Sequence, residues 1–298
     1  MKQLCDVPAP AKLNLFLHVT GRRPDGYHLL QTVFTFIDLA DRLHFTLRDD
    51  GRIVRETDVP GVPHDEDLIV RAARLLQQHA PAGSNAAAGV SIRIDKHIPA
   101  GGGLGGGSSD AASTLIALNR LWECGMSRQA LQALGLTLGA DVPVFIFGQA
   151  AFAEGVGEAL QACPVPAAVY VLFIPTISVA TATVFASADL TRDTKSIIMH
   201  DFAGHDIHQF GRNDLQAAAC ALFKPLSLFV GWLETLGIQA RMTGSGACFF
   251  VAYPGLQEAE ACRQRVEYAL ASYPEARQWL RQVVICHGIS RHPLYNWI

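Results

Sequence analysis

A glycine-rich segment at residues 101–107 has the composition of a phosphate-binding loop. Only Leu104 interrupts its glycines, and Ser108 and Ser109 follow directly. Backbone without side chains can approach a bulky anion closely and can adopt positive φ, and the start of a helix directs unpaired N–H groups at the same point. We therefore expect a phosphate group to bind here. The glycines are Gly101, Gly102, Gly103, Gly105, Gly106 and Gly107.

The elements around this segment occur in the order that such a loop needs. Residues 90–94 alternate like a half-buried strand, and apolar residues recur at helical spacing over residues 111–121. Ser108 or Ser109 is expected to cap this helix. A flexible linker is the simpler alternative, but linkers have polar flanks. Here the apolar pair at residues 98–99 precedes the glycines, so the order of strand, loop and helix is preferred.

Two common phosphate motifs fit this segment less well. The spacing Gly101-x-Gly103-x-x-Gly106 matches the dinucleotide fingerprint, which needs an acidic residue roughly 20 residues later at a strand end. Glu123 instead falls at the end of the predicted helix, and no lysine follows the glycines as a P-loop requires. An NAD-dependent oxidoreductase and a non-enzymatic nucleotide-binding module are kept as alternatives from other functional classes.

The composition of the chain indicates a protein without nucleic-acid or membrane partners. Its 298 residues are half hydrophobic, and 24 Lys and Arg against 27 Asp and Glu leave a net charge of −3. This balance gives no global attraction to polyanions. The 7 cysteines are odd in number and never spaced as C-x-x-C, which is typical of reduced thiols in the cytoplasm.

The pattern of the early residues predicts strands and a hairpin. Residues 13–19 alternate as a strand, with Lys12 and Asn14 on one face; a turn at residues 21–26 and an apolar stretch at residues 32–39 follow. Further strands are predicted at residues 43–47, 90–94, 169–174, 248–253 and 283–286, and helices at residues 68–76, 111–121, 131–138, 214–236 (divided near Pro225) and 256–271.

These elements predict an α+β protein of two domains. The small, glycine-punctuated residues 150–157 are the best boundary, so we expect domains at residues 1–155 and 156–298. The polar residues 189–210 are expected to form an exposed excursion. A second small-residue loop at residues 243–247 is an ordinary tight turn by itself, but it can also lie across the same cleft and support the glycine-rich segment through backbone contacts.

Three segments in this order resemble the GHMP kinases over nearly the whole chain. They are Pro10-Ala11-Lys12-Leu13-Asn14-Leu15 with Gly26-Tyr27-His28, the glycine-rich segment through Ala112, and Thr243-Gly244-Ser245-Gly246-Ala247. The resemblance implies an N-terminal ribosomal-protein-S5-like ATP-binding domain, a C-terminal ferredoxin-like domain and a cleft between them. It also implies transfer of the γ-phosphoryl group of ATP to an alcohol.

Within this family, the run at residues 21–28 is most similar to the members that phosphorylate the 2-hydroxyl of a cytidyl diphosphate sugar alcohol in non-mevalonate isoprenoid precursor biosynthesis. Kinases of the mevalonate or homoserine type are the alternative inside the family. We expect a monomer or a weak homodimer, and the sequence does not distinguish between these two states.

The resemblance implies a catalytic pair. Asp141 matches the general base of the family and Lys12 its partner lysine; an ammonium beside a carboxylate holds it ionised and oriented. By their local sequence alone, Asp141 is as readily a turn-capping aspartate, and Lys12 a solvated lysine at a strand end.

The resemblance also implies binding residues. Tyr27 and Phe185 match positions that enclose the cytosine ring and His28 the position that reads its edge, although all three are alternatively packing or turn residues. Asn14 is expected at the sugar-alcohol end. Further contacts are expected for Thr243 and Gly244 with this substrate, and for Lys96, Pro99, the segment 101–107, Ser108 and Ser109 with ATP.

Two features limit what the resemblance implies on the ATP side. Asp67 stands where related sequences usually carry Asn, and a carboxylate accepts but does not donate, so the adenosine contact there is uncertain. Mg²⁺ is expected with ATP, but its ligands are not assigned. A cluster in the polar excursion, His200, Asp201, His205, Asp206 and His208, has metal-binding residue types but reads as a solvated loop.

Overall fold

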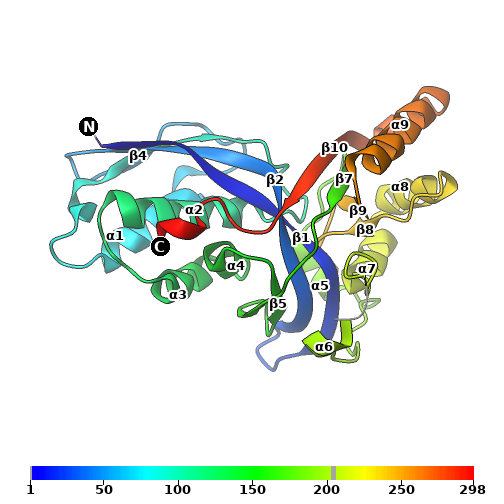
Figure 1. The fold of residues 1–298 in the computed structure, drawn as a ribbon, viewed down its shortest axis with the longest axis horizontal. Helices are drawn as coiled ribbons and strands as arrows, with labels where there is room; N and C mark the ends of the chain where they lie inside the picture. The colour runs from blue at the N-terminus through cyan, green and yellow to red at the C-terminus, as the bar shows by residue number, and fades with distance from the viewer. Residues whose placement is uncertain (1, 203–205) are drawn as a thin grey trace.

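The computed structural model describes residues 2–202 and 206–298 and has the α+β composition that the sequence predicts (Figure 1). Two strands of 20 residues each, β1 (Gln3–Arg22) and β2 (His28–Leu47), form a long antiparallel hairpin that starts near one end of the molecule and bends at its middle. Lys12 pairs with Phe36 and Asn14 with Phe34 in its register.

The other strands extend this hairpin on both sides. Their order in the sheet is β3-β4-β2-β10-β7-β9-β8, with β1 and β5 also pairing with β2, and β6 pairing with β5. These strands are β3 (Ile53–Arg55), β4 (Val90–Asp95), β5 (Ala151–Glu154), β6 (Ala159–Ala162), β7 (Val169–Pro175), β8 (Arg241–Met242), β9 (Phe249–Tyr253) and β10 (Leu280–Ile289).

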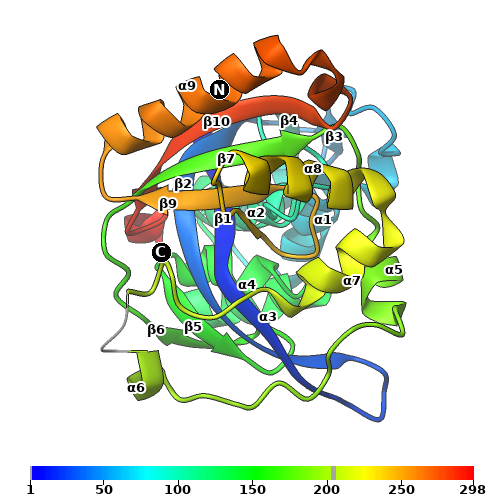
Figure 2. The same cartoon turned by 90° about the vertical axis from the view of Figure 1, so that its right-hand side faces the viewer.

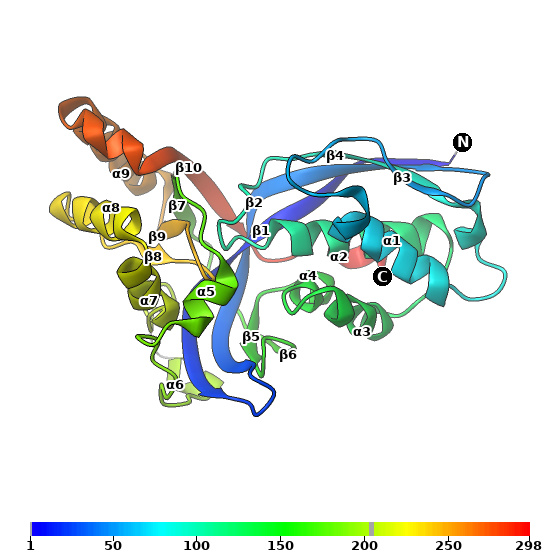
Figure 3. The ribbon, with the colours of Figure 1, turned by 180° about the vertical axis from the view of Figure 1, so that it is seen from behind.

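The helices form two groups on opposite sides of the molecule, which Figure 3 shows from behind. The first group is α1 (Leu68–His79), α2 (Gly106–Leu121), α3 (Arg128–Leu138) and α4 (Val142–Phe147). The second is α5 (Thr181–Ala186), α6 (Met199–Phe202), α7 (Asp214–Leu222), α8 (Lys224–Thr235) and α9 (Leu256–Ser272). Short 3₁₀ helices lie at His64–Glu66, Asn85–Ala88, Pro274–Gln278 and Tyr295–Trp297.

Each helix group encloses its own hydrophobic core. Helices α1 to α4 pack on the β1, β2 and β4 side around Leu115, Trp122 and Phe145. Helices α7, α8 and α9 lie on one side of β7, β9 and β10, as Figure 2 shows, and this core contains Phe173, Phe229 and Phe249. The last residues of the chain, including Trp297, return to the first core. The division at residues 155 and 156 stays a prediction.

Most predicted elements are present, but two predictions about local structure were wrong. The expected separate strands at residues 32–39 and 43–47 are one strand, because the register shift between Pro10 and Lys12, which lie opposite Ala40 and Phe36, changes which face the side chains occupy. The segment 150–157 contains β5, which pairs with β2, so the predicted division at residues 155 and 156 falls just after this strand. The polar excursion at residues 189–210 is only partly exposed, because Leu190 and Ile207 are buried.

The alternative of a dinucleotide-binding βαβ unit does not agree with the topology. Helix α2 leads into α3 and α4 and then into β5, which runs antiparallel to β2. Among the named strands within residues 2–202 and 206–298, only β3 and β4 pair in parallel. A dinucleotide fold needs a parallel strand after the glycine helix. By length and composition, no single helix in the described ranges qualifies as a membrane span; α7 and α8 pass that test only jointly, across a 118° bend.

Candidate active site

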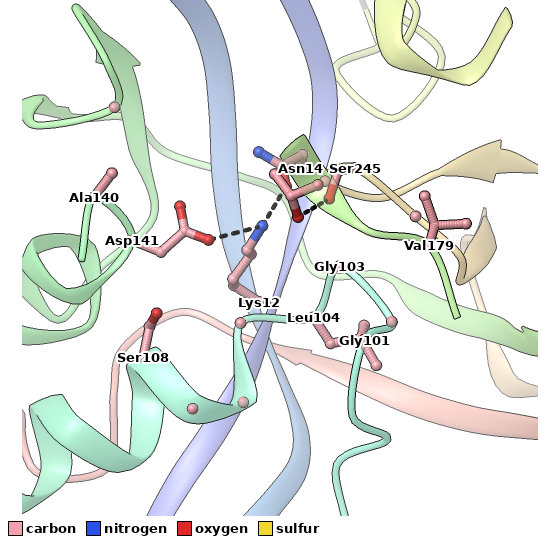
Figure 4. Close-up of a pocket in the computed structure, with 18 of the residues that line it drawn as sticks. Lys12, Asn14, Gly101, Gly103, Leu104, Ser108, Ala140, Asp141, Val179 and Ser245 are labelled. Carbon is pink, nitrogen blue, oxygen red and sulfur yellow. Dashed lines mark hydrogen bonds and ion pairs between the residues drawn. The ribbon is translucent and has the colours of Figure 1, made fainter. Parts of the chain in front are cut away.

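A cleft of about 1030 Å³ lies between the two helix groups. The glycine-rich segment and the start of α2 form one wall, and the β1–β2 turn, α5 and residues 244–246 form another. Figure 4 shows Lys12, Asp141 and Ser108 pointing into the space between them. The hairpin also contributes Lys12, Asn14 and Thr32 to the lining of the cleft.

The glycine-rich segment ends in a helix start that no side chain caps. Gly105 takes the left-handed conformation at φ 73°, and α2 begins at Gly106. The first intrahelical bond of this turn is donated by Ser109 N–H to Gly105 O, so the N–H groups of Gly106, Gly107 and Ser108 precede it without an intrahelical acceptor. The expectation that Ser108 or Ser109 caps the helix was wrong, because both already lie inside its first turn.

The glycines are required by close packing as well as by conformation. A Cβ on Gly102 would lie 2.6 Å from Cys248 Sγ, and one on Gly103 2.2 Å from Thr243 O. The N–H groups of Ala247 and Cys248 donate to the carbonyls of Gly101 and Gly102 at 3.2 and 3.1 Å. The prediction that the second small-residue loop supports the first through its backbone is therefore confirmed.

Ser108 and Ser109 face different surroundings, although they are adjacent. Ser108 lines the cleft, whereas Ser109 is fully buried and its hydroxyl donates to Pro10 O at 2.7 Å. Successive helical residues are rotated by about 100°, so one of the two must turn inward. Of the other predicted ATP contacts, Pro99, Leu104 and all six glycines line the cleft.

Lys12 and Asp141 meet in the cleft. Lys12 Nζ lies 3.5 Å from Asp141 Oδ2, and the side chains are 3% and 38% exposed (Figure 4). The carboxylate of Asp141 does not cap α4, although the residue occupies the N-cap position. Lys12 is not a solvated lysine at a strand end, because its ammonium also donates to Asn14 Oδ1 at 2.6 Å and lies 5.4 Å from the centre of the Phe34 ring.

Asn14 and Thr243 connect this pair to the second loop. Asn14 Nδ2 donates to Thr32 Oγ1 at 2.9 Å, and its backbone N–H donates to Thr243 Oγ1 at 3.0 Å. Thr243 is fully buried and lies behind the cleft wall, whereas Gly244 lines the cleft. The amide of Asn14 is therefore fixed by Thr32 through its nitrogen and orients Lys12 through its oxygen.

The predicted base-binding residues gather at the other end of the cleft. Tyr27, His28 and Phe185 all line it. The rings of His28 and Phe185 are in contact, with centroids 5.0 Å apart and planes inclined at 32°. Tyr27 is 64% exposed at the tip of the β1–β2 hairpin. Burial, then the charges of Arg192 and Arg22, lower the pKa of His28, so its imidazole is held neutral.

The ammonium of Lys96 is enclosed by two carboxylates. It donates to Asp110 Oδ2 at 2.7 Å and to Asp41, and Lys96 also lines the cleft. Burial opposes charge on Lys96, but Asp110 and Asp41 outweigh it and raise the pKa of the lysine. Lys96 therefore holds the start of α2 against β2 from the side of the cleft.

Both carboxylate oxygens of Asp67 accept hydrogen bonds from other groups of the protein. Its Oδ1 accepts the N–H of Ile69 at 2.9 Å, which caps α1, and its Oδ2 accepts Arg55 Nη1 at 2.6 Å. A carboxylate can accept both of these bonds, whereas an amide in its place would accept through one oxygen only. The residue still lines the cleft.

The described residues contain no group of three or more His, Cys, Asp or Glu side chains placed to hold a metal ion. Of the cluster in the polar excursion, His200, Asp201 and Asp206 are exposed, and His208 packs against Tyr170 with centroids 5.8 Å apart. His205 lies outside the described residues.

Sequence reasoning missed three residues that support the site. Asp41 is fully buried, and the charge within the apolar run 33–43 was its only signal. Asn213 caps α7 and holds Met242 O and Gly244 O at 2.7 and 2.8 Å. Arg192 donates to His28 Nε2 at 3.1 Å from within the polar excursion, where nothing local marks it.

Comparisons with known proteins agree with this geometry. The family model for the GHMP kinases N terminal domain matches residues 67–149, and that for the GHMP kinases C terminal matches residues 198–272. The 4-diphosphocytidyl-2-C-methyl-D-erythritol kinase of Bordetella bronchiseptica is 51% identical over 299 residues, which cover 99% of each chain.

Solved structures of GHMP kinases have the same fold as this chain. The crystal structure of a 4-(cytidine 5'-diphospho)-2C-methyl-D-erythritol kinase superposes with a TM-score of 0.76 at 33% identity, covering 96% of this chain and 99% of that one. Homoserine kinase from Cytophaga hutchinsonii shares the fold, with a TM-score of 0.69 at 16% identity over 98% and 96% of the chains. This chain belongs to the GHMP kinases.

Proposed function

We propose that this kinase transfers the γ-phosphoryl group of ATP to the 2-hydroxyl of 4-diphosphocytidyl-2-C-methyl-D-erythritol. The observation that carries the proposal is the Lys12–Asp141 pair, which faces an uncapped helix start across one cleft. The full-length relatives that carry this activity in their names support the same assignment.

The glycine-rich wall suits a triphosphate. The N–H groups of Gly106, Gly107 and Ser108 and the positive end of the α2 dipole favour an anion at this point. A Cβ on Gly105 would lie 2.9 Å from Phe145 Cζ and 3.1 Å from Lys12 Cγ, so a side chain here would disturb both the loop and the lysine. Phosphoryl transfer needs mainly such positioning and charge neutralisation.

In this proposal Asp141 is the general base. Its carboxylate takes the proton of the 2-hydroxyl, the freed oxygen bonds to the γ-phosphorus, and the bond from that phosphorus to the β–γ bridging oxygen breaks to release ADP. Lys12 keeps Asp141 oriented and neutralises charge that develops on the attacking oxygen. Mg²⁺ bound with ATP would neutralise phosphate charge, with phosphate oxygens, water and Ser108 as the ligand types available.

The aromatic end of the cleft selects the acceptor. Tyr27 and Phe185 offer ring faces and His28 a polar edge, which a nucleobase needs. Mevalonate and homoserine have no base for these residues to hold. This feature favours the cytidyl substrate over the other activities of the fold.

The proposal extends to the state of the protein. We propose a cytoplasmic monomer or weak homodimer without nucleic-acid or membrane partners, divided into an ATP-binding domain at residues 1–155 and a substrate-binding domain at residues 156–298. The net charge of −3 supports the absence of polyanionic partners, and two of the three hydrophobic clusters, one in each part of the chain, support the division.

A coupled ADP-release assay tests the function. The purified chain is given ATP and Mg²⁺ with the cytidyl substrate, mevalonate or homoserine in parallel, and we expect turnover with the cytidyl substrate alone. A thermal-shift measurement with ATP and NAD is expected to show protection by ATP only. Turnover of mevalonate or homoserine at a comparable kcat/KM, or protection by NAD, would exclude the proposal.

A further inference from the structure

We propose that Arg192 holds His28 in the tautomer that carries its proton on Nδ1, and that this N–H selects cytosine over uracil by donating to ring nitrogen N3. Arg192 is a positioning residue in this scheme, because it acts on the substrate only through His28. The part that concerns the base rests on the proposed function, whereas the part that concerns the tautomer does not.

The hydrogen bond between the two residues fixes the direction of donation. Arg192 Nε lies 3.1 Å from His28 Nε2. A guanidinium has only N–H donors, so Nε2 must accept. A neutral imidazole that accepts at Nε2 carries its single proton on Nδ1. His28 therefore presents a donor, and not an acceptor, through its other nitrogen.

Arg192 is itself anchored by three carbonyls. Its Nη1 donates to Leu190 O at 3.0 Å, and its Nη2 donates to Phe185 O at 3.0 Å and Ser187 O at 2.7 Å. Two of these carbonyls lie at the C-terminal end of α5, which carries Phe185. One guanidinium thus connects the aromatic wall from the second half of the chain to His28 at the start of β2.

The charges around His28 keep the imidazole neutral, as this arrangement requires. Burial is the largest cause that lowers its pKa, and the positive charges of Arg192 and Arg22 lower it further. A protonated imidazole would place an N–H at Nε2, directly opposite the N–H of Arg192. The neutral Nδ1–H form is the one in which both groups are satisfied.

A fixed donor distinguishes the two pyrimidines. Cytosine N3 is an acceptor, whereas uracil N3 carries a proton and is a donor. The Nδ1–H group of His28 would meet an acceptor in cytosine and a second donor in uracil, leaving both donors unpaired in the cleft. A site built to bond one group rejects an analogue that leaves its polar atoms unpaired. We expect discrimination of about tenfold or more in kcat/KM.

Two substitutions separate the bond to His28 from the carbonyl anchor. Arg192→Met removes every donor. Arg192→Gln keeps an amide nitrogen the same number of bonds from the backbone as Arg Nε, so it can still donate to His28 Nε2, but it loses both Nη groups. A structural loss would affect the two variants equally, whereas loss of the tautomer affects only the first.

Nuclear magnetic resonance of the ¹⁵N-histidine-labelled protein tests the tautomer without substrate. We expect the unprotonated nitrogen of His28 to be Nε2 in the wild type and in Arg192→Gln, and a mixture of tautomers with a raised pKa in Arg192→Met. A wild-type spectrum in which Nε2 carries the proton overturns the proposal.

Kinetics with the cytidyl substrate and its uridyl analogue test the selection. Arg192→Met is expected to lower the cytidyl-to-uridyl ratio of kcat/KM about tenfold through KM, with kcat and the KM for ATP unchanged, and Arg192→Gln is expected to retain most of the ratio. In a His28→Asn background, whose amide can donate or accept, Arg192→Met should cause no further change. Equal losses in Met and Gln, or an unchanged ratio in Met, refute the role of Arg192. A wild-type protein that phosphorylates neither compound refutes the proposed function instead, while the spectra still report the tautomer.

Discussion

Lys12 Nζ and Asp141 Oδ2 lie 3.5 Å apart, although one residue comes from β1 and the other from the residue before α4. The lysine is almost fully enclosed and the carboxylate remains partly open to the cleft. This asymmetry suits a pair in which the buried cation orients the anion and the anion meets the substrate.

Asp141→Asn removes the charge of the proposed base and keeps its size. We expect kcat to fall about 10²- to 10⁴-fold, because proton transfer to a positioned base contributes on that order. ATP binding should persist, because the amides of the α2 start are untouched. Coupled ADP release measures the first and protection by ATP in a thermal-shift assay the second. A variant with near-normal kcat would remove Asp141 from the mechanism.

Gly105→Ala is expected to impair both ATP binding and turnover. Gly105 has a φ of 73°, and its new Cβ would lie 2.9 Å from Phe145 Cζ and 3.1 Å from Lys12 Cγ. Gly125→Ala is the matched control, since Gly125 has a φ of 64° but nothing lies within 4 Å of its Cβ position. The control should lose about 1 kcal/mol of unfolding free energy with normal KM for ATP. Equal KM values in both variants would contradict the role of close packing.

Ser108→Ala is expected to affect ATP binding, whereas Ser109→Ala is expected to affect stability. Ser108 lines the cleft, so its loss should raise the KM for ATP about 2- to 10-fold, the worth of one hydrogen bond. Ser109 donates to Pro10 O at 2.7 Å in the interior, so its loss should cost about 1 kcal/mol of unfolding free energy and leave KM unchanged. Steady-state kinetics measure the KM for ATP and urea unfolding measures the stability of both variants. A raised KM in Ser109→Ala with a loss of stability in Ser108→Ala would show that the two roles are exchanged.

Because of the buried His292, the free energy of unfolding is expected to fall in mild acid. Burial, with a smaller contribution from Arg128, lowers the pKa of His292 to about 3. Between pH 6.5 and 3 the unfolded chain therefore binds a proton that the folded chain does not, and the free energy of unfolding falls as the pH falls. At pH 5 this amounts to about 2 kcal/mol relative to pH 7.

His292→Asn isolates this contribution, because its Oδ1 can still accept the N–H of Leu294, which His292 Nδ1 accepts at 3.1 Å. The difference in unfolding free energy between wild type and variant should shrink by about 2 kcal/mol from pH 7 to pH 5. The exposed His79, replaced by Asn, serves as control and should leave the pH dependence unchanged. A difference that is constant with pH would show that His292 binds its proton equally well in the folded and unfolded states.

Local demands on the backbone made several features predictable. Glycines at positive φ, apolar periodicity and the break near Pro225 act within a few residues, so the glycine loop, α2, the pair α7 and α8, and the α+β class followed from the sequence. The family resemblance added Lys12, Asp141 and the base-binding residues, and the structure brings these into one cleft.

Long-range contacts were not predictable in the same way. The bulges that join residues 32–39 and 43–47 into one strand depend on the register with β1, and the direction of Ser109 depends on Pro10 in another element. The hydrogen bond from Arg192 to His28 joins a polar segment without periodicity to a strand from the opposite end of the sequence.

The sequence by itself determined that a phosphate-binding loop precedes a helix, because glycine spacing is a property of neighbouring residues. Only the tertiary structure decided which serine faces the cleft and which arginine donates to His28. Those outcomes depend on strand register and on helix rotation relative to distant partners, and neither quantity is set by nearby residues.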